Sequence, residues 1–271
     1  MTSPSAPPLA VVTGASSGIG YSLAAQFAKN GFDVVIAAED AELQVATRSL
    51  EQLGASVVPV RVDLATAEGV RALHAAIAAT GRPVDSLAIN AGVGVGGAFV
   101  ETDLDAELNL IALNVTSAVH LAKLLLPDMV AAGHGRVLFT SSIAASAPGP
   151  FHATYAASKA FLHSLSESIR NELKDTGVTV TALMPGPTDT EFFDRAGMQD
   201  TRVGSSSSKD DPDDVAKQGF DALMAGEHHV VAGSAKNKLM VASGRVLPEP
   251  AKAEMQRKLT EPGHGDDGRD R

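Results

Sequence analysis

One stretch near the start of the chain decides the fold: Leu9-Ala-Val-Val-Thr13-Gly14-Ala15-Ser16-Ser17-Gly18-Ile19-Gly20. Residues 9–12 are apolar and predict a buried strand, and the residues from Gly18 onward predict a helix that is closed by Gly31. Glycines in a strand-to-helix turn let the backbone approach a pyrophosphate, and the start of the helix offers free N–H groups to it. The sequence therefore predicts a dinucleotide-binding turn with contacts from Gly14, Ser16, Ser17, Gly18, Ile19 and Gly20.

The rest of the chain repeats this alternation of short β-branched runs and longer segments rich in Ala and Leu. Strands are predicted at 9–12, 34–38, 56–62, 84–90, 135–141, 178–184 and 229–232. Helices are predicted at 18–30, 41–53, 67–79, 104–113, 115–132, 153–175 and 213–225. Repeated βα units of this kind predict an α/β fold: a single-domain Rossmann doubly wound parallel sheet of about seven strands, flanked by helices on both faces.

The domain organisation follows from the same pattern. Residues 1–8 are rich in Ser and Pro and predict a flexible N-terminus, and residues 9–260 form one domain without a dividing linker. Within it, residues 188–211 predict a mobile substrate flap, and the Gly- and Asp-rich residues 261–271 predict a disordered tail. Residues 236–247 are amphipathic. They indicate either a helix that covers the sheet or a surface for a membrane or a partner subunit.

Composition excludes several classes of function. The chain has no cysteine, so disulfides, thiolate zinc sites and cysteine nucleophiles are excluded, and a cytoplasmic location is expected. No signal peptide and no apolar run long enough for a membrane span are found in the sequence. The net charge of −10 argues against a nucleic-acid partner. None of the eight histidines shows metal-ligand spacing, and His228 and His229 are expected to point in different directions, so no metal site is expected.

Two acidic residues, Glu39 and Asp40, follow the second predicted strand. A dinucleotide fold places an acid about 20 residues beyond its glycines to bind the adenosine ribose. Glu39 is therefore a candidate ribose ligand. The alternative, a solvated carboxylate at the start of a helix, stays open.

Tyr155 and Lys159 are four residues apart on a predicted helix, so both side chains project from one face. A free phenol has a pKa near about 10, too high for an efficient proton carrier at neutral pH. An ammonium group nearby is expected to lower that pKa, and the same lysine is placed to bind a ribose hydroxyl. The pair predicts a general acid/base centre beside a nucleotide.

Further motifs stand in a fixed order along the chain: Val62-Asp63-Leu64, Asn90-Ala91-Gly92, Asn114, Ser142 thirteen residues before Tyr155, and Pro185-Gly186-Pro187-Thr188-Asp189-Thr190. Together with the glycine turn and Tyr-x-x-x-Lys, this set resembles the short-chain dehydrogenase/reductase family, whose turn reads T-G-x-x-x-G-x-G. The resemblance covers about residues 9–232. It implies an NAD(P)-dependent oxidoreductase that moves a hydride between a nicotinamide and an alcohol or carbonyl substrate.

The resemblance also assigns roles to residues. It implies that Tyr155 donates the proton, that Ser142 orients the substrate oxygen, and that Lys159 and Asn114 pass a replacement proton inward. Cofactor contacts are implied for a further set: Glu39, Asp63, Leu64, Asn90, Ala91, Gly92, Tyr155, Lys159, Pro185, Gly186, Thr188 and Thr190.

The preferred cofactor is expected to be NAD, with NADP as the alternative. In the family an Asp at the position of Ala38 favours NAD and an Arg at the position of Glu39 favours NADP, and this chain has neither. Glu39 is expected to repel a 2′-phosphate, and Ser17 adds no positive charge to the turn.

Further expectations and alternatives concern the partners, the function and the residues around the pocket. The partner is expected to be a small-molecule alcohol or carbonyl compound, and a homodimer or homotetramer is expected from the family. A catalytically silent dinucleotide-binding regulator on the same fold is the alternative, as is a nucleotide-sugar epimerase. His152 is either a substrate contact or an exposed loop residue, and Phe192, Phe193 and Met198 either face an apolar substrate or pack on the core.

Overall fold

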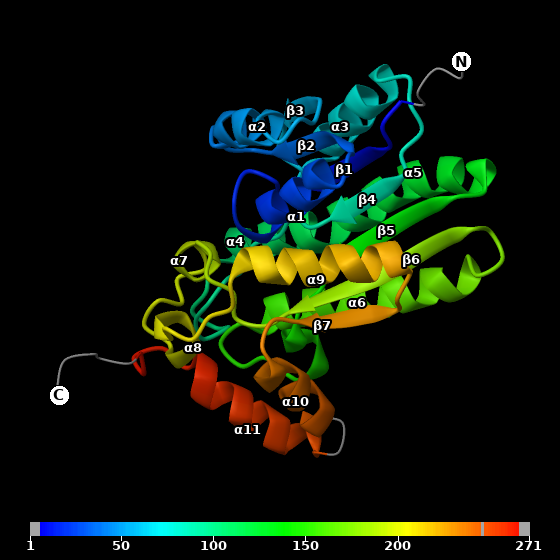
Figure 1. The fold of residues 1–271 in the computed structure, drawn as a ribbon. Helices are drawn as coiled ribbons and strands as arrows, with labels where there is room; N and C mark the ends of the chain where they lie inside the picture. Colours follow the sequence, from blue (N-terminus) through cyan, green and yellow to red (C-terminus); the bar gives the residue numbers. More distant parts are fainter. Residues whose placement is uncertain (1–5, 245–246, 266–271) are drawn as a thin grey trace.

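The computed structural model describes residues 6–244 and 247–265, and in this part of the chain seven parallel strands form one sheet (Figure 1). The strands are β1 (Leu9–Thr13), β2 (Asp33–Ala38), β3 (Val57–Arg61), β4 (Ser86–Ile89), β5 (Gly135–Thr140), β6 (Val178–Pro185) and β7 (His229–Ala232). Their order across the sheet is β3-β2-β1-β4-β5-β6-β7. The chain therefore reverses its direction of winding between β1 and β4, which is where a doubly wound sheet opens a crevice for a ligand.

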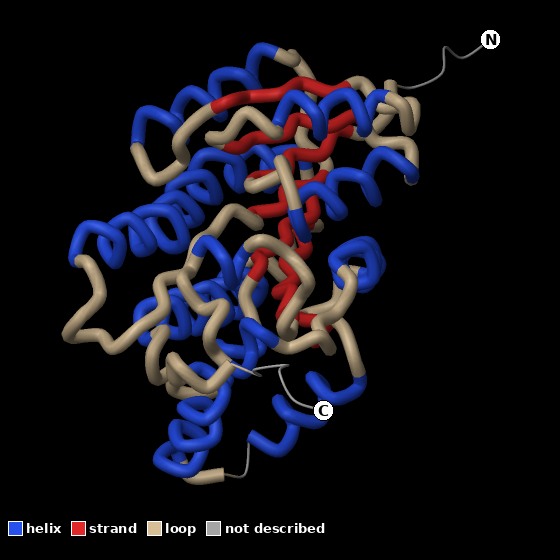
Figure 2. The backbone as a smooth tube through the Cα atoms, turned by 90° about the vertical axis from the view of Figure 1, so that its left-hand side faces the viewer, coloured by secondary structure: helices blue, strands red, loops and turns tan. Residues whose placement is uncertain are grey.

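Helices cover both faces of the sheet, which appears edge-on as the red strands of Figure 2. The helices are α1 (Gly18–Lys29), α2 (Leu43–Glu51), α3 (Ala67–Ala79), α4 (Leu104–Ile111), α5 (Ser117–Ala132), α6 (Ala153–Glu172), α7 (Phe192–Arg195), α8 (Arg202–Ser205), α9 (Pro212–Ala225), α10 (Ala235–Gly244) and α11 (Glu249–Thr260). The predicted fold class is confirmed.

Two apolar cores hold these layers together, one on each face of the sheet. In the first, Leu23 and Phe27 of α1 pack with Phe220 of α9 against alternate residues of β1 and β2. In the second, residues of α3, α5 and α6 cover the other face, with Leu73 and Leu121 among them. Because successive strand side chains point to opposite faces, the apolar runs of β1 and β2 contribute to both cores.

The helices predicted at 104–113 and 115–132 correspond to α4 and α5, but the predicted break between them is wrong, because the helix is continuous from Leu104 to Ala132. Its middle, Ala112–Thr116, is a π-helical turn that joins α4 to α5 without a break. By length and composition this helix alone, within the described residues, would be long and apolar enough to cross a membrane.

The C-terminal segment contains a helix that the sequence analysis missed, α11. Residues 236–247 were predicted to be amphipathic, and α10 lies there, with Val241 buried and Leu239 exposed. The predicted disordered tail begins at 261, yet Gly263 N–H donates to Asp200 Oδ2 at 3.0 Å, so its first residues lie against the flap. Residues 1–5 and 266–271 lie outside the described residues.

Candidate active site

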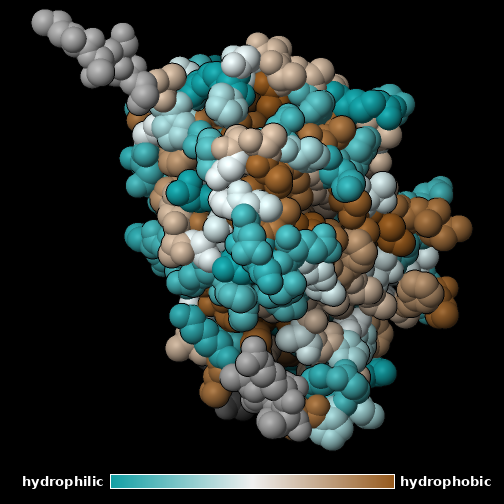
Figure 3. Space-filling model, turned by 90° about the vertical axis from the view of Figure 1, so that its right-hand side faces the viewer, coloured by the Kyte–Doolittle hydropathy of each residue, from teal (hydrophilic) through white to brown (hydrophobic). Residues whose placement is uncertain are grey.

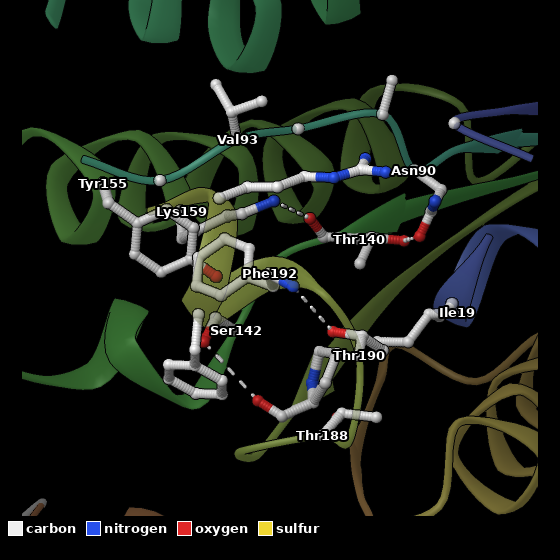
Figure 4. A pocket seen from close by; sticks show the side chains of 18 of the residues that line it. Ile19, Asn90, Val93, Thr140, Ser142, Tyr155, Lys159, Thr188, Thr190 and Phe192 are labelled. Atoms are coloured by element: carbon white, nitrogen blue, oxygen red, sulfur yellow. Dashed lines mark hydrogen bonds between the residues drawn. The ribbon is translucent and has the colours of Figure 1, made fainter. Parts of the chain in front are cut away.

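A single elongated pocket collects the predicted cofactor contacts and all but one of the predicted catalytic residues. It opens at the carboxyl ends of the strands, where loops follow β1 to β6. The cofactor candidates that line it are Gly14, Ser16, Ser17, Gly18, Ile19, Gly20, Glu39, Asp63, Leu64, Asn90, Ala91, Gly92, Tyr155, Lys159, Pro185, Gly186, Thr188 and Thr190. Ser142 lines it as well, whereas Asn114 is not among the lining residues. Ten of the lining side chains are labelled in Figure 4.

The glycine turn is built by close backbone packing. Gly14 has φ +66°, in the left-handed region that favours glycine, and its N–H donates to Ala37 O at 2.8 Å. A methyl group added at Gly20 would lie 2.0 Å from Gly14 O, so the first turn of α1 rests directly on the loop. The side chain of Ser17, the N-cap of α1, makes no capping hydrogen bond. The first N–H groups of α1 thus remain available to an anion.

The far end of the pocket carries acidic side chains. Glu39 is exposed at the end of β2, and Asp40 Oδ2 accepts a hydrogen bond from Ser16 Oγ at 2.8 Å. The other carboxylate oxygen of Asp40 is buried without a hydrogen-bond partner among the described residues. Asp63 Oδ1 accepts from Ala65 N at 2.8 Å. Hydroxyl groups of a sugar would find acceptors here, as a ribose site requires.

Asn90 and Thr140 link the central strands by hydrogen bonds below the pocket. Asn90 Nδ2 donates to Thr13 O at 3.1 Å, and Thr140 Oγ1 donates to Asn90 Oδ1 at 3.0 Å. Thr13 Oγ1 accepts from the N–H groups of both Asn90 and Ala91. Thr13 and Thr140 therefore position β1, β4 and β5, a role that the sequence analysis did not assign to them.

Ser142, Tyr155 and Lys159 meet at the near end of the pocket (Figure 4). Ser142 follows β5, and its hydroxyl is hydrogen-bonded to Tyr155. Lys159 Nζ lies 5.6 Å from the centroid of the Tyr155 ring and donates to Thr140 O at 2.9 Å. The spacing of four residues on α6 brings phenol and ammonium to one face of the helix, as predicted.

The expected direction of the Tyr155 pKa is wrong. Burial raises the pKa of Tyr155 to about 12, and the hydrogen bond from Ser142 acts against that rise. Burial also lowers the pKa of Lys159 to about 8. The reason is desolvation: both groups lie away from water, which penalises their charged forms, and the Lys159 ammonium is held by a carbonyl oxygen. At neutral pH the phenol is protonated and is therefore ready to donate.

Asn114 lies behind the pocket, in the π-helical turn. Its Oδ1 accepts from Val93 N and its Nδ2 donates to Val93 O, both at 2.9 Å. Nδ2 also lies 3.1 Å from Ser158 Oγ. A methyl group added at Gly92 would lie 3.0 Å from Asn114 Oδ1 and 3.3 Å from Lys159 Nζ, so both side chains approach the same bare backbone. Asn114 thus lies in a π-helical turn, a feature that is frequent at functional sites.

The flap forms the outer wall of the pocket. Phe193 and Met198 are buried in a small apolar cluster, and Phe192 packs against it. The Phe192 ring lies 5.0 Å from that of Tyr155, centroid to centroid. These side chains pack on each other, apart from the two cores of the sheet, and they also line the pocket. Contact with an apolar substrate stays a prediction.

Among the pocket residues that were not predicted from the sequence are Gln256, Leu259 and Thr260, all on α11. Thr260 Oγ1 donates to Pro150 O at 2.8 Å, which fixes the end of this helix near α6. Pro250 near the helix start and the spacing of 256, 259 and 260 are signals that would have predicted α11.

His228 and His229 both lie beside Glu167 of α6. Nδ1 of His228 and of His229 lie 3.6 and 3.7 Å from the Glu167 carboxylate, so the expected divergence is wrong. Strand alternation does not apply, because His228 precedes β7. Within the described residues no group of three or more His, Asp or Glu side chains is placed to hold a metal ion.

The pocket and its fold match known proteins. A family model described as short chain dehydrogenase matches residues 8–200. The chain belongs to the short-chain dehydrogenase family. An oxidoreductase of Staphylococcus saprophyticus is 33% identical over 222 residues, which cover 81% of this chain and 92% of that protein. A short chain dehydrogenase of Pseudocercospora fijiensis is 32% identical over 73% of this chain, and the match spans 64% of that longer protein.

Solved structures agree with this membership. A short-chain dehydrogenase from Sphingobium yanoikuyae in complex with NADPH superposes with a TM-score of 0.77 at 30% identity, covering 83% of this chain and 87% of that chain. One from Burkholderia phymatum in complex with NAD gives a TM-score of 0.77 at 27% identity, covering 94% and 97%. This short-chain dehydrogenase is an oxidoreductase that transfers a hydride between a nicotinamide cofactor and an alcohol or carbonyl group.

A nicotinamide dinucleotide fits the residues present. The glycines leave a bare cradle at the N-terminus of α1, acidic acceptors lie at one end, and Tyr155 and Lys159 lie at the other. This arrangement matches the adenosine ribose at the acidic end, the pyrophosphate at the glycine turn and the nicotinamide beside Tyr155 and Lys159.

Proposed function

We propose that Tyr155 is the general acid/base of this short-chain dehydrogenase and that Ser142 and Lys159 serve it directly. The observation that carries the proposal is their convergence: the Ser142–Tyr155 hydrogen bond and the Lys159 ammonium lie at the inner end of the cofactor pocket. A substrate carbonyl placed there receives hydrogen bonds from two hydroxyl groups. A donor positioned in this way contributes about 10²–10⁴-fold to the rate.

When bound, the nicotinamide supplies or accepts the hydride, and its oxidised form brings a positive charge. The chain's own residues handle the proton. Tyr155, protonated at neutral pH because of its raised pKa, donates to the developing alkoxide. Lys159 lies next to it, and Asn114 shares the approach to Gly92 with Lys159. The Lys159 ammonium returns a proton to the phenolate, and Asn114 holds the Val93 backbone in place beside it.

The test is an assay of cofactor oxidation and reduction against a panel of ketones, aldehydes and secondary alcohols. Turnover of at least one pair, lost in Lys159→Met, is the expected result, because the ammonium neutralises the phenolate that forms. Tight cofactor binding without turnover of any panel member would instead favour the catalytically silent regulator. The known relatives, which are oxidoreductases, do not favour that alternative.

We further propose that NAD is the preferred cofactor. At the adenosine end the lining side chains with charge are Glu39, Asp40 and Asp63, and all three are acidic. A 2′-phosphate about 4 Å from one carboxylate would be repelled by about 1–4 kcal/mol, depending on the local dielectric. Solved relatives bind either NADPH or NAD, so the charge at this end of the pocket is what supports the choice.

Dissociation constants for NADH and NADPH test this preference. NADH is expected to bind at least about tenfold more tightly, which corresponds to about 1.4 kcal/mol. Glu39→Arg is expected to reduce or reverse this preference, measured as the ratio of the NADPH and NADH dissociation constants. Glu42→Arg, which makes the same charge change at an exposed residue outside the pocket lining, is the control and leaves the ratio unchanged. NADPH bound tenfold more tightly by the unmodified protein would contradict the proposal.

A homodimer or homotetramer is proposed on the basis of exposed apolar side chains. Leu104, Leu108 and Ile111 are 69%, 53% and 41% exposed and recur at helical spacing along one side of α4. Phe99 and Val100 lie just before them and are 66% and 91% exposed. Figure 3 shows hydrophobic residues gathered along one side of the face it draws. Contiguous exposed apolar side chains of this kind mark interaction surfaces.

Size-exclusion chromatography with light scattering tests the assembly. Leu108→Glu is expected to shift the protein to a smaller species, because a carboxylate in the centre of an apolar contact is desolvated without a partner. Leu239→Glu, at an exposed leucine on α10, makes the same substitution away from α4; it is the control and leaves the assembly intact. An unmodified protein that is monomeric at all concentrations would contradict the proposal.

The remaining proposals concern partners and location. The substrate is a small-molecule alcohol or carbonyl compound with an apolar part, since Phe192, Phe193 and Met198 line the pocket beside Tyr155. A cytoplasmic location is proposed because the chain has no cysteine.

A further inference from the structure

His152 is a buried histidine whose two ring nitrogens make no hydrogen bond among the described residues. It lies immediately before α6, three residues ahead of Tyr155, and is 7% exposed. Within the described residues neither Nδ1 nor Nε2 has a hydrogen-bond partner, and both atoms are buried. The alternative of an exposed loop residue is therefore wrong.

An unpartnered imidazole is costly in such a place. A neutral ring carries one donor and one acceptor, and each loses its hydrogen bonds with water on burial. Burial lowers the pKa of His152 to about 4, so the ring stays neutral near pH 7 and keeps both functions. Buried polar groups without partners are rare in native proteins, and each calls for a reason.

The backbone that holds the His152 ring is itself strained. Phe151 has φ +60°, a left-handed conformation that non-glycine residues rarely adopt. Its carbonyl accepts from Gly97 N at 2.8 Å, and the Arg257 guanidinium lies 5.1 Å from its ring centroid. A methyl group added at Gly149 would lie 2.5 Å from His152 Nε2, so the ring rests on a bare glycine. Loop and C-terminal helix thus fix the imidazole in place.

The ring lines the same pocket as Tyr155. Its centroid lies 6.0 Å from the centroid of the Tyr155 ring, in an edge-to-face arrangement. Met198, Val203 and Leu259 are apolar residues that line the same pocket. Ser142 and Tyr155 bind the reacting oxygen of the substrate. The imidazole of His152 is then the polar group beside Tyr155 that can contact another part of the substrate, and the apolar residues contact its carbon chain.

We infer that His152 determines substrate specificity by hydrogen bonding a second oxygen of the substrate, carried on the first or second carbon from the reacting one. The substrate class is then an apolar α-hydroxy ketone, its 1,2-diol, or a β-keto ester. The inference rests on the proposed function of Tyr155 and Ser142. His152 takes no part in hydride or proton transfer and acts only through binding.

The test compares three ketones that share an apolar chain: 1-hydroxy-2-octanone, ethyl 3-oxooctanoate and 2-octanone. The first two carry a second oxygen and the third does not. The unmodified enzyme is expected to prefer at least one two-oxygen probe over 2-octanone by about 10–100-fold in kcat/KM, as a site built to hydrogen-bond a substrate group does. His152→Phe, which fills the space without a donor or acceptor, is expected to abolish that preference, mainly through KM.

Two further measurements separate recognition from a structural role. His152→Gln keeps a donor and an acceptor and is expected to restore part of the preference. The melting temperature of His152→Phe is expected to equal or exceed that of the unmodified enzyme, because two unpaired buried nitrogens are removed. A lower melting temperature together with equal losses for all three ketones would make His152 structural and overturn the inference.

The remaining outcomes also discriminate. A selectivity ratio that is unchanged in His152→Phe overturns the inference on His152 alone, because turnover of 2-octanone shows that the chemistry of Tyr155 operates. Absence of turnover for all three ketones and for the wider panel of carbonyl compounds and alcohols overturns the proposed function together with it.

Discussion

Tyr155→Phe is expected to lower kcat by about 10²–10⁴-fold, the range that a positioned general acid supplies, while the dissociation constant of the cofactor changes little. The substitution removes one oxygen and leaves the ring that packs against Phe192. The Ser142 hydroxyl loses a partner, yet it retains the hydrogen bond from Ala144 N at 3.1 Å. Steady-state rates and cofactor titration by fluorescence measure the two quantities separately.

The chain offers a matched control, since its second tyrosine, Tyr21, lies on α1 against the core and does not line the pocket. Tyr21→Phe is expected to leave kcat within about twofold, as for a surface or peripheral change. A Tyr155→Phe enzyme with the rate of the unmodified protein would exclude Tyr155 as the acid.

Gly20→Ala is expected to weaken cofactor binding by about 100-fold or more, which corresponds to about 3 kcal/mol. The added methyl would lie 2.0 Å from Gly14 O, 2.7 Å from Gly14 C and 2.5 Å from Asn90 Nδ2. Two of these atoms are backbone, so the clash cannot be relieved by a side-chain rotation. The turn has to open, and the N–H groups of α1 then lose their alignment with the phosphates. Overpacking of this kind also lowers stability, by about 1–3 kcal/mol.

Ser17→Ala is the control in the same turn, because it removes a hydroxyl that makes no capping bond and adds no atom. Its melting temperature is expected to match that of the unmodified protein, and its cofactor affinity to fall only severalfold. Equilibrium dissociation constants and thermal melts provide both readouts. Full cofactor affinity in Gly20→Ala would show that the turn is not the phosphate site.

Much of the site follows from local sequence. The strand-turn-helix pattern around Gly14 and the four-residue spacing of Tyr155 and Lys159 depend on neighbours in the chain, and both are in place in the structure. The order of the motifs at strand ends predicted that they would share one edge of the sheet, because the carboxyl ends of parallel strands meet there.

Other features escaped local reasoning. In the π turn, Asn114 makes hydrogen bonds to Val93 and Ser158, which lie far away in the sequence. The pKa of Tyr155 is governed by how much water reaches it, which no spacing of residues reveals. His152, in the loop before α6, and residues of α11 line the same pocket only in the folded chain, because they lie about 100 residues apart in the sequence.

The sequence by itself determined the parallel sheet, the dinucleotide turn and the identity of the phenol and the ammonium group. These are set by periodicity, glycine spacing and side-chain chemistry, all of which act over a few residues. Only the tertiary structure decided the electrostatics of the centre and the shape of the substrate cavity. Burial and the meeting of distant segments create both, and they exist only after the chain has packed.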